Sequence, residues 1–305
     1  MKIYTQLNDL SHQFPKIAVA LGTFDGVHIG HQQIVSRAVE LARAIDGTSV
    51  VFTFSNHPLS IVDPNRCPLQ IVAYEYKNQL MEAMGVDVLL TIPFTHQFLT
   101  LSPGEFIKLL ADNLRPTYIV VGPNYSFGYK GTGTPETLEN AGCEFGFKTE
   151  IQQAVYVDDI IVSSTIIRQM ITQGNVHQAA RLLGRPLQIQ GTVIAGEKRG
   201  RTLGYPTANI AINEGLAIPD DGVYVVQIAV GKFQYKGVAN VGTNPTFNCS
   251  ERRIEIYLLN FAGNLYGKTV TVAFLDRIRG EIAFTTAEQL KMQIALDIKV
   301  AENYL

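Results

Sequence analysis

The sequence is poor in cysteine, and its three cysteines, Cys67, Cys143 and Cys249, lie far apart with no Cys-x-x-Cys pair. Such spacing provides no disulfide framework, and it is typical of proteins in a reducing compartment. No cysteine lies close in sequence to the paired histidines described below, which disfavours a zinc site. We therefore expect a cytoplasmic protein without structural disulfides.

Long apolar runs and an excess of positive charge are also missing. No uninterrupted apolar run approaches the roughly 18 residues that span a bilayer, and the first residues contain no apolar signal core. The formal net charge of −2 lacks the basic excess that is typical of nucleic-acid binders. We expect neither a membrane nor nucleic acid as a partner, whereas small anionic ligands remain open; the oligomeric state cannot be read from the sequence.

What is present is enough apolar material for a core. The 305 residues are 46% hydrophobic and 17% charged, which is typical of a globular protein. This length favours two domains, and the hydrophobic periodicity changes near Arg185. We place the domains at residues 1–184 and 185–305.

The first domain has the pattern of an α/β protein. Short apolar segments alternate with helical stretches, which predicts a parallel sheet covered by helices, as in Rossmann-like folds. The sequence Ser-Pro-Gly-Glu at 102–105 has the form of a helical capping box. Further helices should begin at Ser164 and end at Gly174 and Gly184. The expected strands are 17–21, 50–54, 87–92 and 118–121.

In the second domain, apolar residues recur at every second position. Turn-forming residues separate apolar runs at 223–230, 233–241, 253–261 and 268–274, which predicts a small antiparallel β-barrel. From 286 to 304, apolar residues recur at helical spacing, so one amphipathic helix should close the domain. The chain contains no internal repeat.

The first candidate site is the segment Gly-Thr-Phe-Asp-Gly-Val-His-Ile-Gly-His at 22–31. It follows an expected strand and leads into an expected helix, where backbone N–H groups and the helix dipole favour a phosphate. His28 and His31 are three residues apart, so both should face one side of the first helical turn and donate to phosphate oxygens. A tight turn carrying two surface histidines is the simpler alternative.

Two more segments of the first domain have the composition of anion sites. Asn124 lies in a glycine-containing loop after an expected strand, where open α/β sheets bind ligands. Ser164 begins an expected helix, and Arg168 lies one turn further on, which would place hydroxyl, amide and guanidinium donors together. An ordinary loop and an ordinary helix cap would explain these residues equally simply.

The second domain has its own candidate phosphate loop at 191–209. Gly196, Arg201 and Gly204 belong to a glycine-rich, basic stretch between strands, which is suited to a backbone cradle for phosphates. Thr207 and Asn209 are two residues apart in an extended segment, so their oxygens should share one face and suit Mg²⁺. A plain hairpin loop is the alternative.

Segments 22–31, 52–58, 122–128 and 163–168 together resemble, in order, the nucleotidyltransferase motifs of bacterial bifunctional riboflavin kinase/FAD synthetases, the His-x-Gly-His signature included. The Pro-Thr-Ala-Asn run at 206–209 is similar to the riboflavin kinase signature of the same family. The resemblance covers nearly the whole chain. It departs from the family pattern at Asn56, where proline is common, and at Tyr257, where histidine is usual.

The resemblance implies a role for each segment. Glu255 would be the general base on the riboflavin hydroxyl, although as a strand residue alone it suggests only a solvated face. Thr207 and Asn209 would bind Mg²⁺. His28 and His31 would act in adenylyl transfer. The residues implied in ATP or phosphate binding are Gly22, Phe24, Asp25, Gly26, Gly30, Asn124, Ser164, Arg168, Gly196, Arg201 and Gly204. Those implied in flavin binding are Phe54, His57 and Arg279.

The implied function is two-step flavin cofactor synthesis. ATP would phosphorylate riboflavin to FMN in the β domain, and a second ATP would adenylylate FMN to FAD with release of pyrophosphate in the α/β domain. Both steps would use Mg²⁺. Two alternatives remain open: a chain with only the adenylyltransferase half active, and a flavin-binding regulator that keeps the scaffold without turnover.

Overall fold

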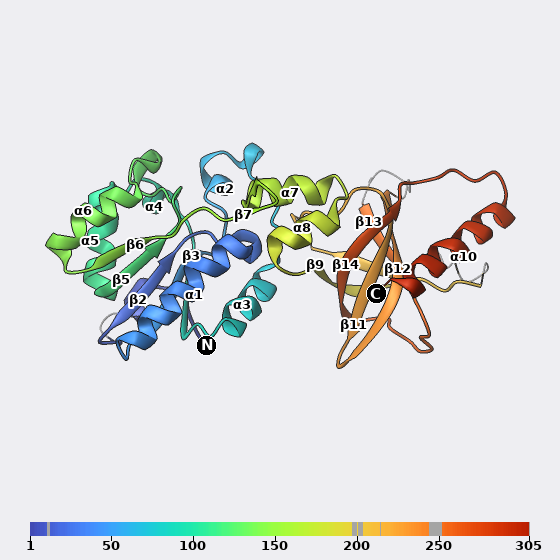
Figure 1. Cartoon of the computed structure of the whole chain (residues 1–305), viewed down its shortest axis with the longest axis horizontal. Helices are drawn as coiled ribbons and strands as arrows, with labels where there is room; N and C mark the ends of the chain where they lie inside the picture. Colours follow the sequence, from blue (N-terminus) through green and yellow to red (C-terminus); the bar gives the residue numbers. More distant parts are fainter. Residues whose placement is uncertain (11–12, 197–199, 201–203, 214, 244–251, 305) are drawn as a thin grey trace. The chain divides into compact units, whose positions relative to one another are not determined.

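The computed structural model describes residues 1–305 except 11–12, 197–199, 201–203, 214, 244–251 and 305 (Figure 1). The chain divides into two compact units, residues 1–68 with 74–163 and residues 69–73 with 164–305. The expected α/β and β-barrel architectures are confirmed, one in each unit. Residues 164–184, which we assigned to the first domain, lie in the second of these compact units; the domain boundary at 184 stays a prediction.

The first unit is built on a six-stranded sheet of order β1-β4-β3-β2-β5-β6, in which all strand pairs are parallel. Four of its strands were expected from the sequence; the short edge strands β1 and β6 were not. The strands are β1 (Lys2–Tyr4), β2 (Ile17–Leu21), β3 (Thr48–Phe54), β4 (Val88–Ile92), β5 (Pro116–Val121) and β6 (Lys148–Ile151).

Both faces of this sheet are buried. Val19 on β2 belongs to one apolar cluster, while its neighbours Ala18 and Ala20 belong to another. Burial on both faces explains why β2 and β4 are continuously apolar instead of alternating. The helices are α1 (Ile29–Ala44), α2 (Leu59–Val62), α3 (Tyr74–Ala83), α4 (His96–Leu99), α5 (Pro103–Leu114) and α6 (Pro135–Phe145), of which α3 begins just after the segment 69–73.

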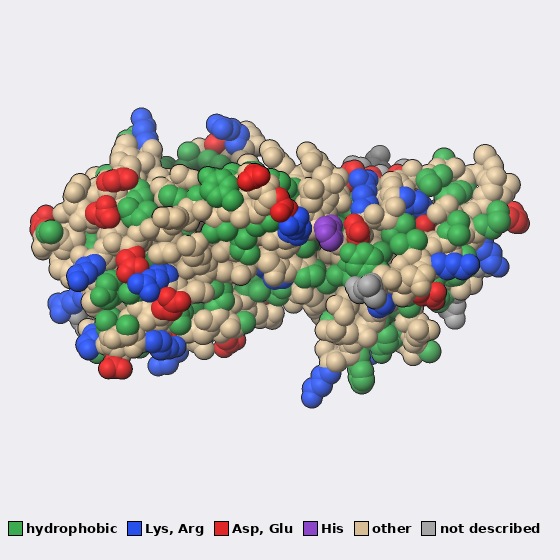
Figure 2. All heavy atoms as spheres, in the orientation of Figure 1, with side chains coloured by type: hydrophobic (Ala, Val, Ile, Leu, Met, Phe, Trp, Pro, Cys, Tyr) green, Lys and Arg blue, Asp and Glu red, His purple; other side chains and the backbone are tan. Residues whose placement is uncertain are grey.

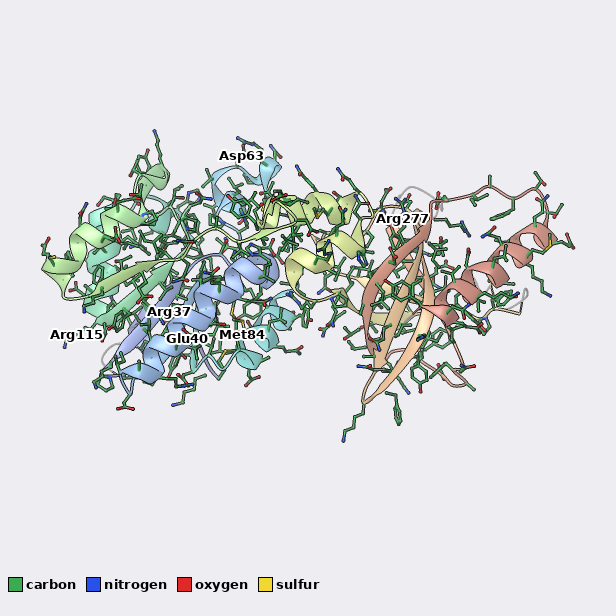
Figure 3. The ribbon with its side chains drawn as sticks, viewed as in Figure 1. Arg37, Glu40, Asp63, Met84, Arg115 and Arg277 are labelled. Atoms are coloured by element: carbon green, nitrogen blue, oxygen red, sulfur yellow. The ribbon has the colours of Figure 1, made fainter. Side chains whose placement is uncertain are left out.

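The helix signals read from the sequence are confirmed in detail. Ser102 caps α5: its hydroxyl accepts the Glu105 N–H, and the Glu105 carboxylate accepts the Ser102 N–H at 2.7 Å. Helix α1 buries Ile34, Val35 and the other apolar residues of its inner face. On its outer face, Arg37 pairs with Glu40 (Figure 3).

The second unit contains a closed barrel of six antiparallel strands in the order β10-β13-β12-β11-β14-β9. The sequence analysis gave no bounds for β9 and β10, although it expected an extended segment at 207–209. The strands are β9 (Leu187–Ile194), β10 (Ala208–Ile212), β11 (Gly222–Val230), β12 (Phe233–Thr243), β13 (Arg252–Leu258) and β14 (Thr269–Arg279). Helix α10 (Ala287–Asn303) follows β14 and packs against β11 and β12, as expected (Figure 1).

Two short helices precede the barrel and pack on it. These are α7 (Ser164–Thr172) and α8 (Val176–Leu183), which ends at Gly184 in the left-handed conformation. Helix α8 contacts β9 and β14. Arg277 on β14, labelled in Figure 3, donates to the carbonyl of Gln173, which lies between the two helices. A two-stranded pair, β7 (Tyr156–Val157) and β8 (Ile160–Ile161), precedes α7 along the chain.

Acidic and basic side chains are interspersed over the face drawn in Figure 2. Of the helices in the described part of the chain, none combines the length and the apolar character that crossing a bilayer requires.

Candidate active sites

The loop after β2 leads through η2 (Asp25–Val27) into α1, as the sequence predicts. Its backbone turns sharply, with positive φ at Phe24 (50°) and Gly26 (80°). The Phe24 side chain is fully buried, and a Cβ on Gly22 would lie 2.9 Å from its ring. Gly22 is therefore the residue that makes room for Phe24. Phe24 can act on a ligand only through its backbone or by supporting its neighbours, whereas Asp25 is half-buried.

The two histidines lie together at the start of α1. Their rings are stacked, with centroids 3.5 Å apart, and the His31 ring lies nearly perpendicular to that of Phe24. The expectation that they share one side is confirmed. His28 is the N-cap of α1 rather than part of its first turn: its Nδ1 accepts the His31 backbone N–H at 3.2 Å. That N–H is consequently occupied, and a neutral His28 ring must carry its proton on Nε2.

The electrostatic environment keeps His31 neutral. The His31 pKa is well below its usual value. The largest cause is loss of solvent around the ring, and the nearby positive charges of His28 and Lys77 lower the pKa further. Its Nδ1 is buried and has no hydrogen-bond partner among the described residues. A neutral, half-buried imidazole beside a helix start can donate one N–H to a ligand oxygen without the cost of desolvating a charge.

The loop after β5 lies beside this turn. Strands β2 and β5 are neighbours, and the chain order reverses between them, because β3 and β4 lie on one side of β2 and β5 on the other. Open α/β sheets bind ligands at such a switch point, outside the carboxyl ends of the strands. A Cβ on Gly122 would be 3.2 Å from Ile34 on α1, so this loop runs close to the helix. Asn124 is exposed in it.

Phe54 and His57 follow β3, the other neighbour of β2. Phe54 is half-buried at the end of β3 and packs edge-on against Phe94 and Phe98. His57 uses its Nδ1 to accept the Leu59 N–H at 3.1 Å, as a cap at the start of α2 does. Phe54 thus belongs to an aromatic cluster at the carboxyl side of the sheet.

Ser164 and Arg168 belong to the second unit, on α7. Arg168 Nε donates to the Leu69 carbonyl at 2.6 Å, and the Arg168 side chain is half-buried. The Ser164 hydroxyl and the Arg168 guanidinium therefore lie about one helical turn apart on α7, as expected. One guanidinium nitrogen, Nε, is used in the hydrogen bond to Leu69. Their role in phosphate binding stays a prediction.

A cavity of about 760 Å³ lies in the second unit between the outer surface of the barrel and α10. Four of the predicted kinase residues line it: Thr207, Asn209, Glu255 and Arg279. The closing wall is largely apolar and comes from α10 and from the segment before it. Its residues include Ile282, Ala283, Phe284, Leu290, Ile294 and Ile298. The cavity therefore combines an apolar wall with a polar floor.

The polar floor is made by neighbouring positions on three strands. In the ladder, Asn209 on β10 lies directly opposite Glu255 on β13, and Glu255 lies opposite Asn240 on β12. Residues directly opposite on an antiparallel pair have Cβ atoms about 4.5–5.5 Å apart. Ile254 and Ile256, on either side of Glu255, are fully buried in the barrel. The alternation that suggested a solvated face for Glu255 instead turns it into the cavity.

The predicted phosphate loop lies at one edge of this floor. A Cβ on Gly196 would overlap the side-chain amide of Asn209, and a Cβ on Gly200 would overlap the Tyr205 carbonyl and lie 3.3 Å from Thr207 Oγ1. Gly204 has φ of 90° and faces open space. Arg201 lies outside the described residues. The glycines thus allow the backbone to approach Thr207 and Asn209 closely, as a phosphate cradle requires.

Arg279 connects the barrel to α10. Its Nη2 donates to Asp297 at 2.8 Å, and its Nε donates to the same carboxylate. Asp297 is only 3% exposed. Nη1 donates to the Gly280 carbonyl. Arg279 lines the cavity, as predicted, but its donors are already directed to the protein, so it shapes the cavity wall more than it offers free hydrogen bonds.

Sequence reasoning missed three polar residues of these sites: Asn240, Asp297 and Lys77. Asn240 lies in an alternating run whose inward residues are Ala239 and Val241. Asp297 interrupts the apolar positions of α10, next to Ile298. Lys77 is buried on α3, one helical turn from Met81. For Asp297 and Lys77, a charged residue at a buried position is the signal that could have found them; Asn240 is an ordinary outward residue of its strand and gives no such signal.

The donors present fit Mg²⁺ better than a softer metal. Within the described ranges, no group of three His, Cys, Asp or Glu lies so as to hold a metal ion. Thr207 and Asn209 instead bring neutral oxygens to the cavity that also contains the Glu255 carboxylate. Oxygen ligands shared with ATP phosphates are the usual environment of Mg²⁺.

Comparisons with known proteins give a family for each of the two parts of the chain. The FAD synthetase family matches residues 10–166, and the riboflavin kinase family matches residues 183–305. The bifunctional riboflavin kinase/FMN adenylyltransferase of Buchnera aphidicola subsp. Schizaphis graminum is 34% identical over 100% of this chain and 99% of the relative. The Bacillus subtilis enzyme of the same name is 36% identical over 95% and 92%.

A solved structure has the same fold throughout. The crystal structure described as a macrolide-efflux protein from Streptococcus pneumoniae superposes with a TM-score of 0.92 and 35% identity, and the alignment covers 100% of both chains. The two family matches and the curated relatives all name the two flavin-forming activities, in the chain order that the sequence motifs indicate. The chain therefore belongs to the family of bifunctional riboflavin kinase/FMN adenylyltransferases, enzymes with an FAD synthetase segment followed by a riboflavin kinase segment.

Proposed function

We propose that the two reactions take place at the two sites described above. Riboflavin is phosphorylated by ATP in the cavity of the second unit, and FMN is adenylylated by ATP at the turn formed by residues 22–31. The observation that carries the proposal is the row Asn209, Glu255 and Asn240 on the floor of a cavity that Thr207 also lines. The scarce and scattered cysteines support a cytoplasmic setting for both reactions.

In the kinase reaction, Glu255 accepts the proton of the primary hydroxyl of riboflavin as its oxygen attacks the γ-phosphorus of ATP and ADP leaves. The apolar wall of the cavity covers the flavin ring and excludes water, while the backbone at Gly196, Gly200 and Gly204 holds the phosphates. Thr207 and Asn209 would hold Mg²⁺, which when bound offsets the negative charge of the ATP phosphates. Asn240 orients the Glu255 carboxylate or the hydroxyl beside it.

In the adenylyl reaction, a phosphate oxygen of FMN attacks the α-phosphorus of ATP, and pyrophosphate leaves. His28 donates from Nε2, because its Nδ1 is engaged by the His31 N–H. Neutral His31 donates one N–H to the same charged region. Such donors stabilise the charge that grows on the α-phosphate in the transition state. The end of β3 provides Phe54, and the loop after β5 provides Asn124, on the two sides of β2.

A cross-feeding experiment tests the division of labour. The double variant His28→Ala/His31→Ala and the single variant Thr207→Ala are each supplied with riboflavin plus MgATP, or with FMN plus MgATP, and the products are separated by chromatography. The histidine variant should accumulate FMN and form no FAD. Thr207→Ala should form FAD from added FMN but little FMN from riboflavin. Equal loss of both activities in either variant contradicts the assignment of separate sites.

The domain boundaries predict a second, independent result. A fragment beginning at Ser164 keeps α7 and α8, which pack with the barrel, and it should fold and phosphorylate riboflavin. A fragment beginning at Arg185 tests whether the barrel and α10 suffice. Circular dichroism and kinase activity of the two fragments measure how much the two helices contribute.

A further inference from the structure

Lys77 is a buried cation next to the turn of the proposed adenylyl site. Its residue is 8% exposed, on α3, the helix that packs against η2. The Nζ atom lies 3.5 Å from Thr53 Oγ1 and 3.4 Å from the Phe54 carbonyl oxygen, both at the end of β3. Thr53 Oγ1 in turn donates to the Thr23 carbonyl at 3.0 Å. A chain of contacts thus connects the ammonium to the segment 22–31.

The described contacts of this ammonium are weak for a buried charge. The hydrogen bonds to Thr53 and Phe54 go to neutral oxygens and are long compared with the 2.7–2.9 Å that is usual for charged donors and acceptors. The charged and titratable groups that act on Lys77 are Asp25 on η2 and His31 on α1. Burial lowers the Lys77 pKa to about 8, against a smaller opposing effect of Asp25.

A buried ammonium without a strong partner costs stability in the free protein. This cost falls when an anion arrives nearby, because the anion compensates the charge. The turn beside Lys77 has the backbone geometry of a phosphate site, and the buried Nδ1 of His31 also lacks a partner among the described residues. Both groups are therefore arranged for a ligand that brings negative charge and oxygen acceptors.

We propose that Lys77 is a further cation of the adenylyl site, which strengthens binding of the ATP polyphosphate from beneath the 22–31 turn. The proposal rests on the location of adenylyl transfer at that turn. It assigns a role in holding ATP to α3, which none of the sequence motifs contains. The Lys77 ammonium would then lower the stability of the ATP-free protein and raise its affinity for ATP.

The first test compares Lys77→Met with Lys108→Met, a control at an exposed lysine of α5. Methionine keeps the length and apolar stem of lysine and removes the charge. We expect Lys77→Met to have a melting temperature equal to or above that of the wild type without ligand, and a KM for MgATP in FAD formation raised at least about tenfold. The KM for riboflavin phosphorylation should not change, and the control should behave as the wild type does.

The second test uses pH and does not depend on the stability of Lys77→Met. Loss of the Lys77 proton removes the cation, so the wild-type KM for MgATP in FAD formation should rise as pH passes from 7 to 9.5. Lys77→Arg keeps its charge throughout this range, and its KM for MgATP should stay level. The dissociation constants of MgATP and of inorganic pyrophosphate, measured by isothermal titration calorimetry, should rise with pH in the wild type and stay level in Lys77→Arg. Both ligands contain the polyphosphate that Lys77 would contact.

The outcomes separate this proposal from the one on which it rests. A lower melting temperature of Lys77→Met with unchanged KM for MgATP assigns Lys77 to packing alone and overturns the inference. A wild-type KM that stays level to pH 9.5 also overturns it. If instead His28→Ala/His31→Ala retains FAD formation, the location of adenylyl transfer is wrong, whatever Lys77 does.

Discussion

The Arg279 guanidinium on β14 donates through Nε and Nη2 to both oxygens of the Asp297 carboxylate on α10, at 3.1 and 2.8 Å. Because Asp297 is buried, this pair is shielded from water and from salt. It is a fixed connection between the barrel and the helix that forms the apolar wall of the kinase cavity.

Asp297→Ala should therefore destabilise the second unit and widen the cavity. Removing one partner of a buried pair leaves an uncompensated charge, which typically costs about 3–5 kcal/mol. We expect a lower melting temperature and a higher KM for riboflavin, measured by calorimetry and by kinase assay. Asp112→Ala is the control, since its ion pair with Lys108 is exposed and should contribute about 0–1 kcal/mol. Equal effects of the two substitutions would show that α10 is held by its apolar contacts.

Glu255→Gln should lower riboflavin phosphorylation by about 10²–10⁴-fold, the usual contribution of a general base. Glutamine keeps the size of the side chain and removes its basicity, so the KM for riboflavin should change little, and FAD formation from added FMN should continue. Thr207→Ala provides the comparison, because it should raise the KM for MgATP instead. Retention of more than about a tenth of wild-type turnover by Glu255→Gln would rule out the role of base.

Gly196→Ala should impair the kinase reaction without affecting the adenylyl reaction. The added Cβ would overlap the side-chain amide of Asn209, which must then move from its place opposite Glu255. Gly104→Ala is the matched control, since a Cβ there meets no atom within 4 Å among the described contacts. Steady-state kinetics of both reactions measure the difference. Wild-type kinase activity in Gly196→Ala would mean that Asn209 can move without loss.

His31 should make the stability of the first unit depend on pH. Its pKa in the folded chain is well below 6.5, mainly because it is buried, so the unfolded chain takes up a proton that the folded chain refuses. Stability must then decrease as pH falls below about 6.5. Thermal unfolding between pH 7.5 and 5 should show a smaller decrease for His31→Gln than for the wild type. The same decrease in both proteins would assign the pH dependence to other groups.

Local patterns predicted the central elements well, because each obeyed one dominant rule. Strand β2 is buried on both faces and reads as an apolar run, and Ser102 with Glu105 forms the capping box that their spacing indicates. Strands β9 and β10 received no bounds, because we read 191–209 mainly as a phosphate loop with an extended end; the pairing of β9 with β10 and β14 defines them as strands. The same holds for β1, which has three residues and one partner.

The same distinction, between local spacing and long-range contacts, separates the site residues that the sequence predicted from those that it did not. His28 with His31, and Thr207 with Asn209, were found because their spacing along one segment places them together. Asn240 and Asp297 were not found, because they join the kinase cavity through strand register and helix packing, which link positions distant in sequence. Lys77 could be suspected only as a charge at an apolar position of α3. Whether it faces an anion site depends on how α3 packs against η2 and the end of β3, which no motif containing Lys77 indicates.

The two sheets differ in how they are protected from pairing with other chains. Closure of the barrel gives each of its described strands a neighbour on both sides, whereas the parallel sheet ends in two open edges, β1 and β6. Open edges can recruit strands from other molecules, and short or charged edges oppose this. Strand β1 has three residues, and on β6 the Glu150 carboxylate is held by Arg37 of α1 at 2.7 Å. Resistance to aggregation during synthesis and heating should therefore depend on the first unit, with β6 as the edge where loss of one ion pair matters most.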